Sequence, residues 1–224
     1  MRLMPRSVLP VLALLPLLAG CARVPALAPV EQIKHRLTVD FTVAGHINPL
    51  YYYFIAIDAQ GDPSLGPLPV VSSPWGNGWG TGNITHYVLY HQGVFTVNQV
   101  RANTNLLLSD QIGIPFETNQ PEGGNLMHVV LDLDTIATNL TRINLNLITT
   151  DHIDVEPNYQ STKPYDALGM TGNSFLNLPV NVSNIFTNSQ SLDPETAGDL
   201  PPQSSSETRN DLDLTDWTID VRSL

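Results

Sequence analysis

The stretch LTVDFTV, residues 37–43, decides the fold class, because apolar and polar side chains alternate along its whole length. Successive side chains of a β-strand point to opposite faces of the sheet, so the apolar residues share one face and the polar residues share the other. One buried face is typical of a strand that covers a core. The stretch therefore predicts a half-buried β-strand where the folded part of the chain begins.

The same period of two returns along the rest of the chain. It is clearest at residues 127–133, 143–147 and 212–221. Residues 51–58 are apolar on both faces, which is typical of a central strand. The first and last strands lie at opposite ends of the folded part, and we expect them to pair.

Two local features predict details of the strands. Two strand-like runs, 84–91 and 94–100, are separated by Gln92-Gly93, which predicts a tight hairpin. Near the C-terminus the apolar phase slips by one residue between Leu214 and Trp217. Because one extra residue in a strand shifts the alternation in this way, the slip predicts a β-bulge.

Helical periodicity is scant, and we expect only single turns at residues 134–140 and 166–170. Many strands without a long amphipathic helix predict an all-β fold, an antiparallel β-sandwich with long irregular loops. Residues 61–83 are rich in Gly, Pro and Trp, and residues 188–211 are rich in Ser, Pro and acidic residues. Loops of this length are usually functional or disordered. We expect the first to be functional and the second to be mobile.

The N-terminus has the pattern of a secretion signal. Arg2 and Arg6 precede an apolar run at residues 8–18, and the run ends in Leu18-Ala19-Gly20-Cys21. This ending resembles the lipobox of bacterial lipoproteins. The resemblance implies cleavage before Cys21, a diacylglycerol thioether on its sulfur and acylation of the new amino terminus. The alternative is an ordinary cleaved signal peptide with a chance cysteine.

Domain organisation follows from the lipobox. We expect a signal peptide at residues 1–20, the lipidated Cys21 with a flexible tether to residue 33, and a single β-sandwich domain at residues 34–224. Cys21 is the only cysteine, so the mature domain has no disulfide. The resemblance places the protein outside the cytoplasm, anchored by lipid to the bacterial membrane. Ala22 leaves the second mature position without the Asp that retains lipoproteins at an inner membrane, which favours the outer membrane where the organism has one.

Charge restricts the partners. The chain has a net charge of −11 and few charged residues overall. An acidic chain repels nucleic acid and anionic lipid surfaces, so we expect no nucleic-acid partner. The membrane is expected to be a partner only through the lipid on Cys21.

Residues 73–82 form the most unusual segment of the chain, because Gly alternates with other residues around Trp75, Asn77 and Trp79. Two Trp rings in a Gly-rich loop predict a platform on which a sugar ring stacks. We therefore take Trp75, Asn77 and Trp79 as candidate ligand-binding residues. The alternative is that both rings fold back and cap the core.

Clusters of carboxylates suggest calcium as a cofactor. The favoured metal pair is Asp58 and Asp62, because Asp58 ends a buried strand and Asp62 precedes Pro63. Two further acidic groups, at residues 151–156 and 211–216, have the same short spacing. For each group the alternative is a solvated acidic loop.

Motifs of the common hydrolases are absent from the sequence: there is no Gly-x-Ser-x-Gly and no His-Glu-x-x-His, and the six histidines are scattered. We therefore expect no enzyme. The favoured function is a non-catalytic binding module for a glycan or another envelope component. A structural or assembly lipoprotein that docks a protein partner is the alternative, and a hydrolase comes third.

Two short segments bear on the choice between a binding module and the alternative functions. Residues 55–63, with Ile-Ala-Ile-Asp followed by Gly-Asp-Pro, and residues 213–219 resemble sugar- or haem-binding β-sandwiches of the DOMON and family-9 carbohydrate-binding kind. The resemblance implies a sandwich fold and a sugar ligand. It covers two strands and their turns.

Overall fold

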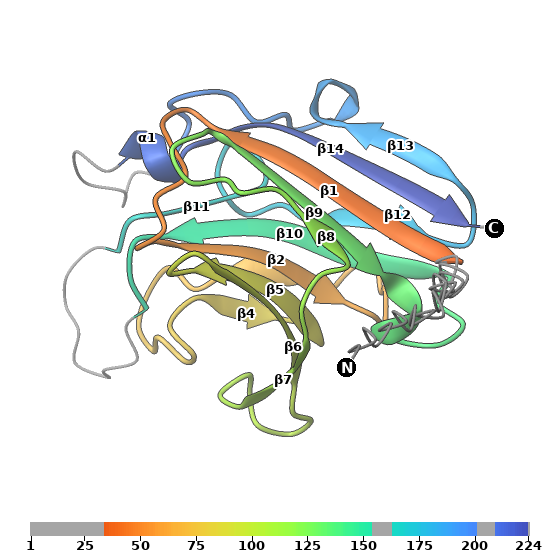
Figure 1. The fold of residues 1–224 in the computed structure, drawn as a ribbon. Coiled ribbons are helices and arrows are strands. Elements are labelled where there is room, and N and C mark those ends of the chain that lie inside the picture. The colour runs from red at the N-terminus through yellow and green to blue at the C-terminus, as the bar shows by residue number, and fades with distance from the viewer. Residues whose placement is uncertain (1–33, 154–162, 201–208, 224) are drawn as a thin grey trace, which may run out of the picture. The chain divides into compact units, whose positions relative to one another are not determined.

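The structure is a computed structural model, and it describes residues 34–153, 163–200 and 209–223. The predicted signal peptide, Cys21 and the predicted tether lie outside the described residues. In the described part no helix is long and apolar enough to cross a membrane. Two antiparallel sheets form the body of the domain, as Figure 1 shows, so the predicted all-β sandwich is confirmed.

Within the described residues, the first sheet has five strands. They follow one another as β13 (Asn184–Thr187), β14 (Leu214–Ser223), β1 (His35–Val43), β9 (Leu126–Asp132) and β8 (Glu117–Thr118). The second sheet has seven strands in the same part of the chain. Six follow one another as β11 (Tyr165–Ala167), β10 (Arg142–Thr150), β2 (Tyr52–Asp58), β5 (His86–His91), β6 (Val94–Val100) and β7 (Ser109–Gly113), and β12 (Leu176–Pro179) also pairs with β10.

Smaller elements complete the fold. Strands β3 (Pro67–Pro69) and β4 (Gly80–Gly82) form a separate two-stranded ribbon. The short helices of the described part are the 3-10 turns η1 (Leu133–Thr135) and η2 (Asn188–Gln190) and the single α-helical turn α1 (Arg209–Leu212).

One core lies between the two sheets. The apolar residues of the stretch at 37–43 are completely or almost completely buried, while the residues between them are partly exposed, which confirms the predicted alternation. They pack against inward-facing residues of β2, β10, β9 and β14 in a single hydrophobic cluster. Apolar burial of this kind is the main stabilising contribution to such a domain.

The first and last strands pair as expected, with β1 antiparallel to β14. The register shifts at one place: Thr42 lies opposite Asp216, whereas Val43 lies opposite Leu214. The extra residue, Thr215, is the bulge that the slip of apolar phase predicts. The predicted hairpin is also present, because Gln92 and Gly93 both have positive φ angles, 53° and 75°, between β5 and β6.

A second, smaller core covers the outer face of the seven-stranded sheet. It contains Phe54 and Ala56 of β2, Ile148 of β10, Trp79 from the Gly-rich segment, and Ile84, which follows that segment. The segment at 61–83 is therefore a covering layer on that sheet. The single helical turn expected at residues 166–170 is wrong in part. Residues Tyr165–Ala167 form strand β11, which pairs with β10.

Candidate functional site

Trp75 and Trp79 do not form an exposed platform. Their exposed fractions are 5% and 6%. Trp79 stacks on Phe54 with ring centroids 4.0 Å apart and planes 4° apart, and it also contacts Tyr87 at 4.9 Å. Neither ring offers the open face that stacking on a sugar requires. Both rings are buried, and Trp79 packs in the second core on the outer face of the seven-stranded sheet and not in the core between the sheets.

Asn77 has a local role in the same segment. Its side-chain oxygen accepts hydrogen bonds from the backbone N–H groups of Trp79, at 3.0 Å, and Gly80, at 2.9 Å. An Asn oxygen that bonds its own backbone two residues further on is typical of a tight turn. Asn77 therefore fixes the turn that directs Trp79 onto Phe54.

The Asp58 carboxylate is completely buried and its oxygens already accept N–H donors. One oxygen accepts from the backbone of Gln60 at 3.0 Å, and the other accepts from the side-chain amide of Asn144 at 3.1 Å. Asp62 is exposed, and its carboxylate accepts from the backbone and hydroxyl of Ser64. The hydroxyl and backbone N–H of Ser64 hold the pKa of Asp62 below its usual range.

The Asn144 amide connects this turn to the sheet. Besides Asp58, it donates to the carbonyl oxygens of Asp62 and Leu65, both at 2.7 Å. Asn177 continues the network with a hydrogen bond to the carbonyl of Gly61. Asp58 thus anchors a turn, and in the described residues no third acidic or His side chain joins Asp58 and Asp62 in a metal-binding group. The calcium site expected at this pair is not supported.

A surface cleft of about 650 Å³ lies at one end of the sandwich. It lies where β2 ends, β5 begins and β6 ends, and the loop after β6 closes one side. We call it the polar cleft, because its walls include the hydrogen-bonding side chains of Gln60, Thr85, His86, Gln99, Arg101 and Asn103. Ile84, Val100 and Leu106 add apolar surface.

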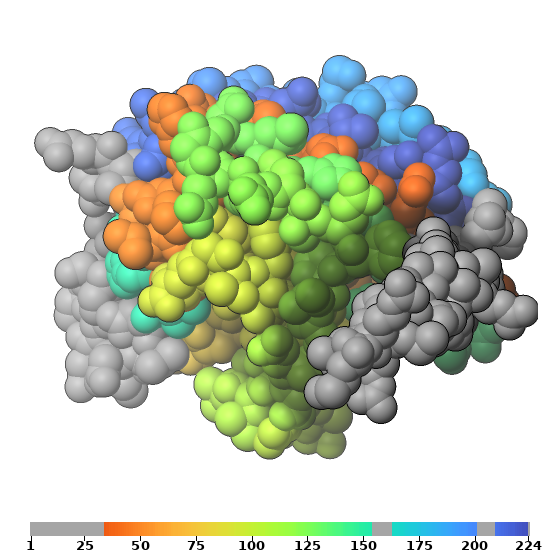
Figure 2. Space-filling view, viewed as in Figure 1, coloured from red at the N-terminus to blue at the C-terminus, as the bar shows by residue number. Residues whose placement is uncertain are grey.

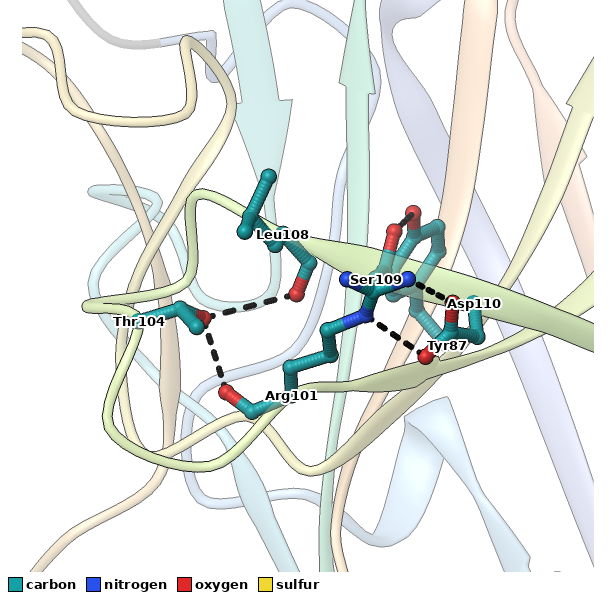
Figure 3. Close-up of polar contacts among 6 residues, drawn as sticks. All are labelled: Tyr87, Arg101, Thr104, Leu108, Ser109 and Asp110. Carbon is teal, nitrogen blue, oxygen red and sulfur yellow. Dashed lines mark hydrogen bonds and ion pairs between the residues drawn. The ribbon is translucent and has the colours of Figure 1, made fainter.

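The β6–β7 loop forms a wall of the polar cleft, and it projects from the body of the domain in Figures 1 and 2. Its shape is fixed by the contacts in Figure 3. The Arg101 guanidinium binds both carboxylate oxygens of Asp110, with one bond of 2.7 Å. Thr104 donates to the Arg101 carbonyl at 2.7 Å, and Tyr87 and Ser109 share a hydrogen bond of 2.7 Å.

The same loop contains unusual backbone angles. Asn103, Asn105 and Leu106 have φ angles of 61°, 49° and 65°. Asn adopts left-handed backbone readily, but for Leu this conformation is strained. Such strain persists only where surrounding contacts hold it, and it is common at binding sites. The loop is therefore a preorganised wall rather than a plain connection.

His86 lines the polar cleft at the start of β5 and is only 4% exposed. Its Nδ1 lies 3.0 Å from the Thr85 hydroxyl, and its Nε2 has no hydrogen-bond partner. Burial lowers the pKa of the His86 imidazole, which favours the neutral ring at neutral pH. A buried ring nitrogen without a partner costs free energy unless something satisfies it.

Sequence reasoning did not identify this cleft. Its polar residues come from the ends of three strands and one loop, and they are individually ordinary. Comparisons with models of protein families, with curated proteins and with solved structures found no match to this chain.

A second surface feature is a run of exposed apolar side chains between the end of the β6–β7 loop and the start of β8. Leu107, Leu108, Ile112, Ile114 and Phe116 are exposed. We call this segment the apolar edge. In the described part of the chain, β7 ends the order of the seven-stranded sheet and β8 ends that of the other.

Proposed function

We propose that the chain is a lipid-anchored, extracytoplasmic binding module that holds a glycan of the cell envelope in the polar cleft. It acts without catalysis. The observation that carries the ligand site is the cleft of about 650 Å³ at the loop end of the sandwich, which is lined by polar side chains. Loops at the end of a rigid β-scaffold are a common place for binding residues.

The chemistry of the cleft suits a glycan. Amides of Gln60, Gln99 and Asn103 both donate and accept hydrogen bonds, as sugar hydroxyls do. Leu106 and Val100 supply apolar contact for sugar C–H groups. The volume of about 650 Å³ is in the range of pockets for small ligands.

The residues that line the cleft also favour a binding module over a hydrolase. A glycosidase of the common type needs two carboxylates on either side of the scissile bond. Among the described residues that line the cleft, Asp58 is the one carboxylate, and its oxygens are engaged by Gln60 and Asn144. Binding without bond cleavage is therefore the proposal that the lining supports.

The ligand proposal is tested by calorimetric titration of the full chain with a panel of envelope glycans. Gln99→Ala and Arg101→Ala should weaken the binding of any glycan that the wild type binds. The matched control is Arg222→Ala, since Arg222 pairs with Asp220 on β14, in the other sheet. Equal affinity of wild type and both cleft variants would remove the cleft from the proposal.

The anchor is proposed on the sequence of the first 21 residues, and it has its own test. Mass spectrometry of the protein from bacterial membranes should show an N-terminal cysteine that carries acyl chains, and Cys21→Ala should release the protein into the soluble fraction. An unmodified Cys21 in the membrane-bound protein would contradict lipid anchoring. The result does not bear on the cleft, so the two halves of the proposal fail separately.

The apolar edge favours a second candidate, a module that docks an extended segment of an envelope protein. An edge strand presents unpaired backbone groups to which another strand can add. A photo-crosslinker at Phe116 should give one discrete adduct in the cell envelope, and the same crosslinker at the exposed Leu192 should not. Identical patterns at both positions would exclude this candidate.

A further inference from the structure

Four carboxylates lie close together where the loop that follows η2 packs on strands β11 and β14. None of them is among the residues that line the polar cleft. Asp166 belongs to β11, Asp213 directly precedes β14, and Glu195 and Asp199 belong to the loop. Asp166 joins the two strands, because its carboxylate accepts from the backbone of Leu214 at 2.7 Å. Glu195 and Asp213 are each only 2% exposed. The sequence thus folds acidic residues into the interior, where charge is costly.

The oxygens of three of these residues are close enough to share one ion. Asp166, Glu195 and Asp199 each offer a carboxylate oxygen, and these oxygens lie within 4.8 Å of one another. Ca²⁺ binds oxygen at about 2.3–2.6 Å, so two ligands on opposite sides of the ion lie about 5 Å apart. The separation of the three oxygens is therefore compatible with one shared ion.

Independent evidence comes from the hydrogen bonds, because one oxygen of each of three carboxylates is held while the other has no partner. Glu195 accepts from the backbone of Gly169, Asp199 from the backbone of Thr196 at 2.8 Å, and Asp213 from the backbone of Gly198 at 2.7 Å. The remaining oxygens are Glu195 Oε2, Asp199 Oδ1 and Asp213 Oδ1, and all three are buried without a hydrogen-bond partner.

Such a pattern needs an explanation, because buried polar atoms in folded proteins are almost always paired. Three carboxylates that are oriented by backbone N–H groups, each with a spare oxygen, are arranged as ligands of a cation. Asp213 lies next to this group, because Gly198, whose backbone N–H donates to Asp213, directly precedes Asp199. Burial raises the pKa of Asp213, and burial together with the neighbouring acidic charges raises the pKa of Glu195 to about 8.

A single lysine cannot balance the charge of four carboxylates. Lys163 is buried and lies three residues before Asp166. Even a full ion pair with Lys163 would neutralise only one of the four carboxylates. A divalent cation removes more of the repulsion and satisfies the spare oxygens at the same time.

We propose that Asp166, Glu195, Asp199 and Asp213 form a calcium site that fixes the loop after η2 to strands β11 and β14. Ca²⁺ fits better than Mg²⁺, because Mg²⁺ keeps several of its waters and this site is largely closed to solvent. Asn188 holds the backbone of Glu195 in place. Its side-chain oxygen accepts from the Glu195 N–H at 2.8 Å, and its side-chain amide donates to the Glu195 carbonyl at 2.9 Å.

The test is a titration of the chelator-treated full chain with Ca²⁺, followed by calorimetry and by thermal unfolding. Wild type should bind one ion per chain, and its Tm should rise with Ca²⁺ concentration. Loss of one charged ligand in Glu195→Gln or Asp199→Asn should weaken Ca²⁺ binding by about tenfold or more. The matched control is Asp62→Asn, at the exposed turn after β2, which should bind Ca²⁺ as the wild type does.

Stability in chelator distinguishes a lost ligand from a misfolded variant. Glu195→Gln removes a buried charge, so without Ca²⁺ its Tm should equal or exceed that of wild type, and added Ca²⁺ should raise it less. An identical Tm of wild type in Ca²⁺ and in chelator would overturn the site. Retention of wild-type affinity in Glu195→Gln, or loss of binding in Asp62→Asn, would also overturn it.

Discussion

The indole ring of Trp79 lies parallel to the ring of Phe54, with centroids 4.0 Å apart. This contact ties the Gly-rich segment to the outer face of β2. It explains why an aromatic, glycine-rich loop covers a sheet here instead of presenting its rings to a ligand. The glycine at position 80 also leaves space for a neighbour: a Cβ there would lie 2.7 Å from the end of the Ile84 side chain, which would have to shift.

Trp79→Ala should therefore destabilise the protein strongly. Removal of a buried aromatic side chain costs about 3–5 kcal/mol of unfolding free energy. Urea unfolding followed by circular dichroism measures the difference. Trp79→Phe retains a ring on Phe54 and should lose less. A Trp79→Ala variant as stable as wild type would mean that the ring is not part of a core.

Asn144→Ala should loosen the turn after β2. The substitution removes the amide that donates to Asp58, Asp62 and Leu65, and it leaves the buried Asp58 carboxylate with fewer donors. Unsatisfied buried groups cost about 1–3 kcal/mol each. Hydrogen exchange of the 60–66 amides measures the loosening. Asn184→Ala, at an exposed Asn on β13, is the control and should leave exchange unchanged.

His86 should make the stability depend on pH. Burial lowers its pKa in the folded state below the ordinary value of about 6.5. The unfolded chain thus binds the proton more readily than the folded chain. The contribution of the neutral His86 ring to the free energy of unfolding is therefore complete above about pH 6.5, and it is lost as the pH falls through the folded pKa.

Urea midpoints at pH 7 and pH 5 compare wild type with His86→Gln. The wild type should lose more stability than the variant between these two pH values. NMR titration of the imidazole gives the folded pKa directly. Equal losses in the two proteins would show that His86 is not desolvated.

Gly61→Ala should also destabilise, and it tests the turn independently of Asn144. Gly61 has a φ of 66°, and a Cβ at this position would lie 2.7 Å from the carbonyl oxygen of Arg142. Both the backbone angle and the contact disfavour Ala. Differential scanning calorimetry should show a lower Tm. Gly123→Ala is the comparison, because Gly123 also has a positive φ, 77°, but open space around it.

The elements that the sequence predicts are those set by local periodicity. The alternation at 37–43, the Gln92-Gly93 turn and the extra residue at Thr215 each leave a pattern within a few neighbouring positions. The strand at Tyr165–Ala167 was missed because three residues are too few for a period, and it forms through pairing with β10.

The sites depend on distant contacts, which explains why the sequence was less informative there. Gly and Trp in one loop are compatible with an exposed platform and with a packed cover, and only the position of Phe54 decides between them. The polar cleft joins His86, Gln99 and Arg101 through strand order. Likewise Asp166 and Glu195 lie on separate segments, β11 and the loop after η2, so short spacing in the sequence pointed to Asp58 and Asp62 instead.

The most direct test of the proposed glycan site is an NMR titration of the isotope-labelled chain with the tightest-binding glycan of the panel. The account predicts that amide signals of Thr85, His86, Gln99 and the 101–106 loop shift in proportion to occupancy, while the indole signals of Trp75 and Trp79 do not move. Shifts confined to the indoles and the 75–80 amides would contradict the polar cleft and return the binding site to the Gly-rich loop.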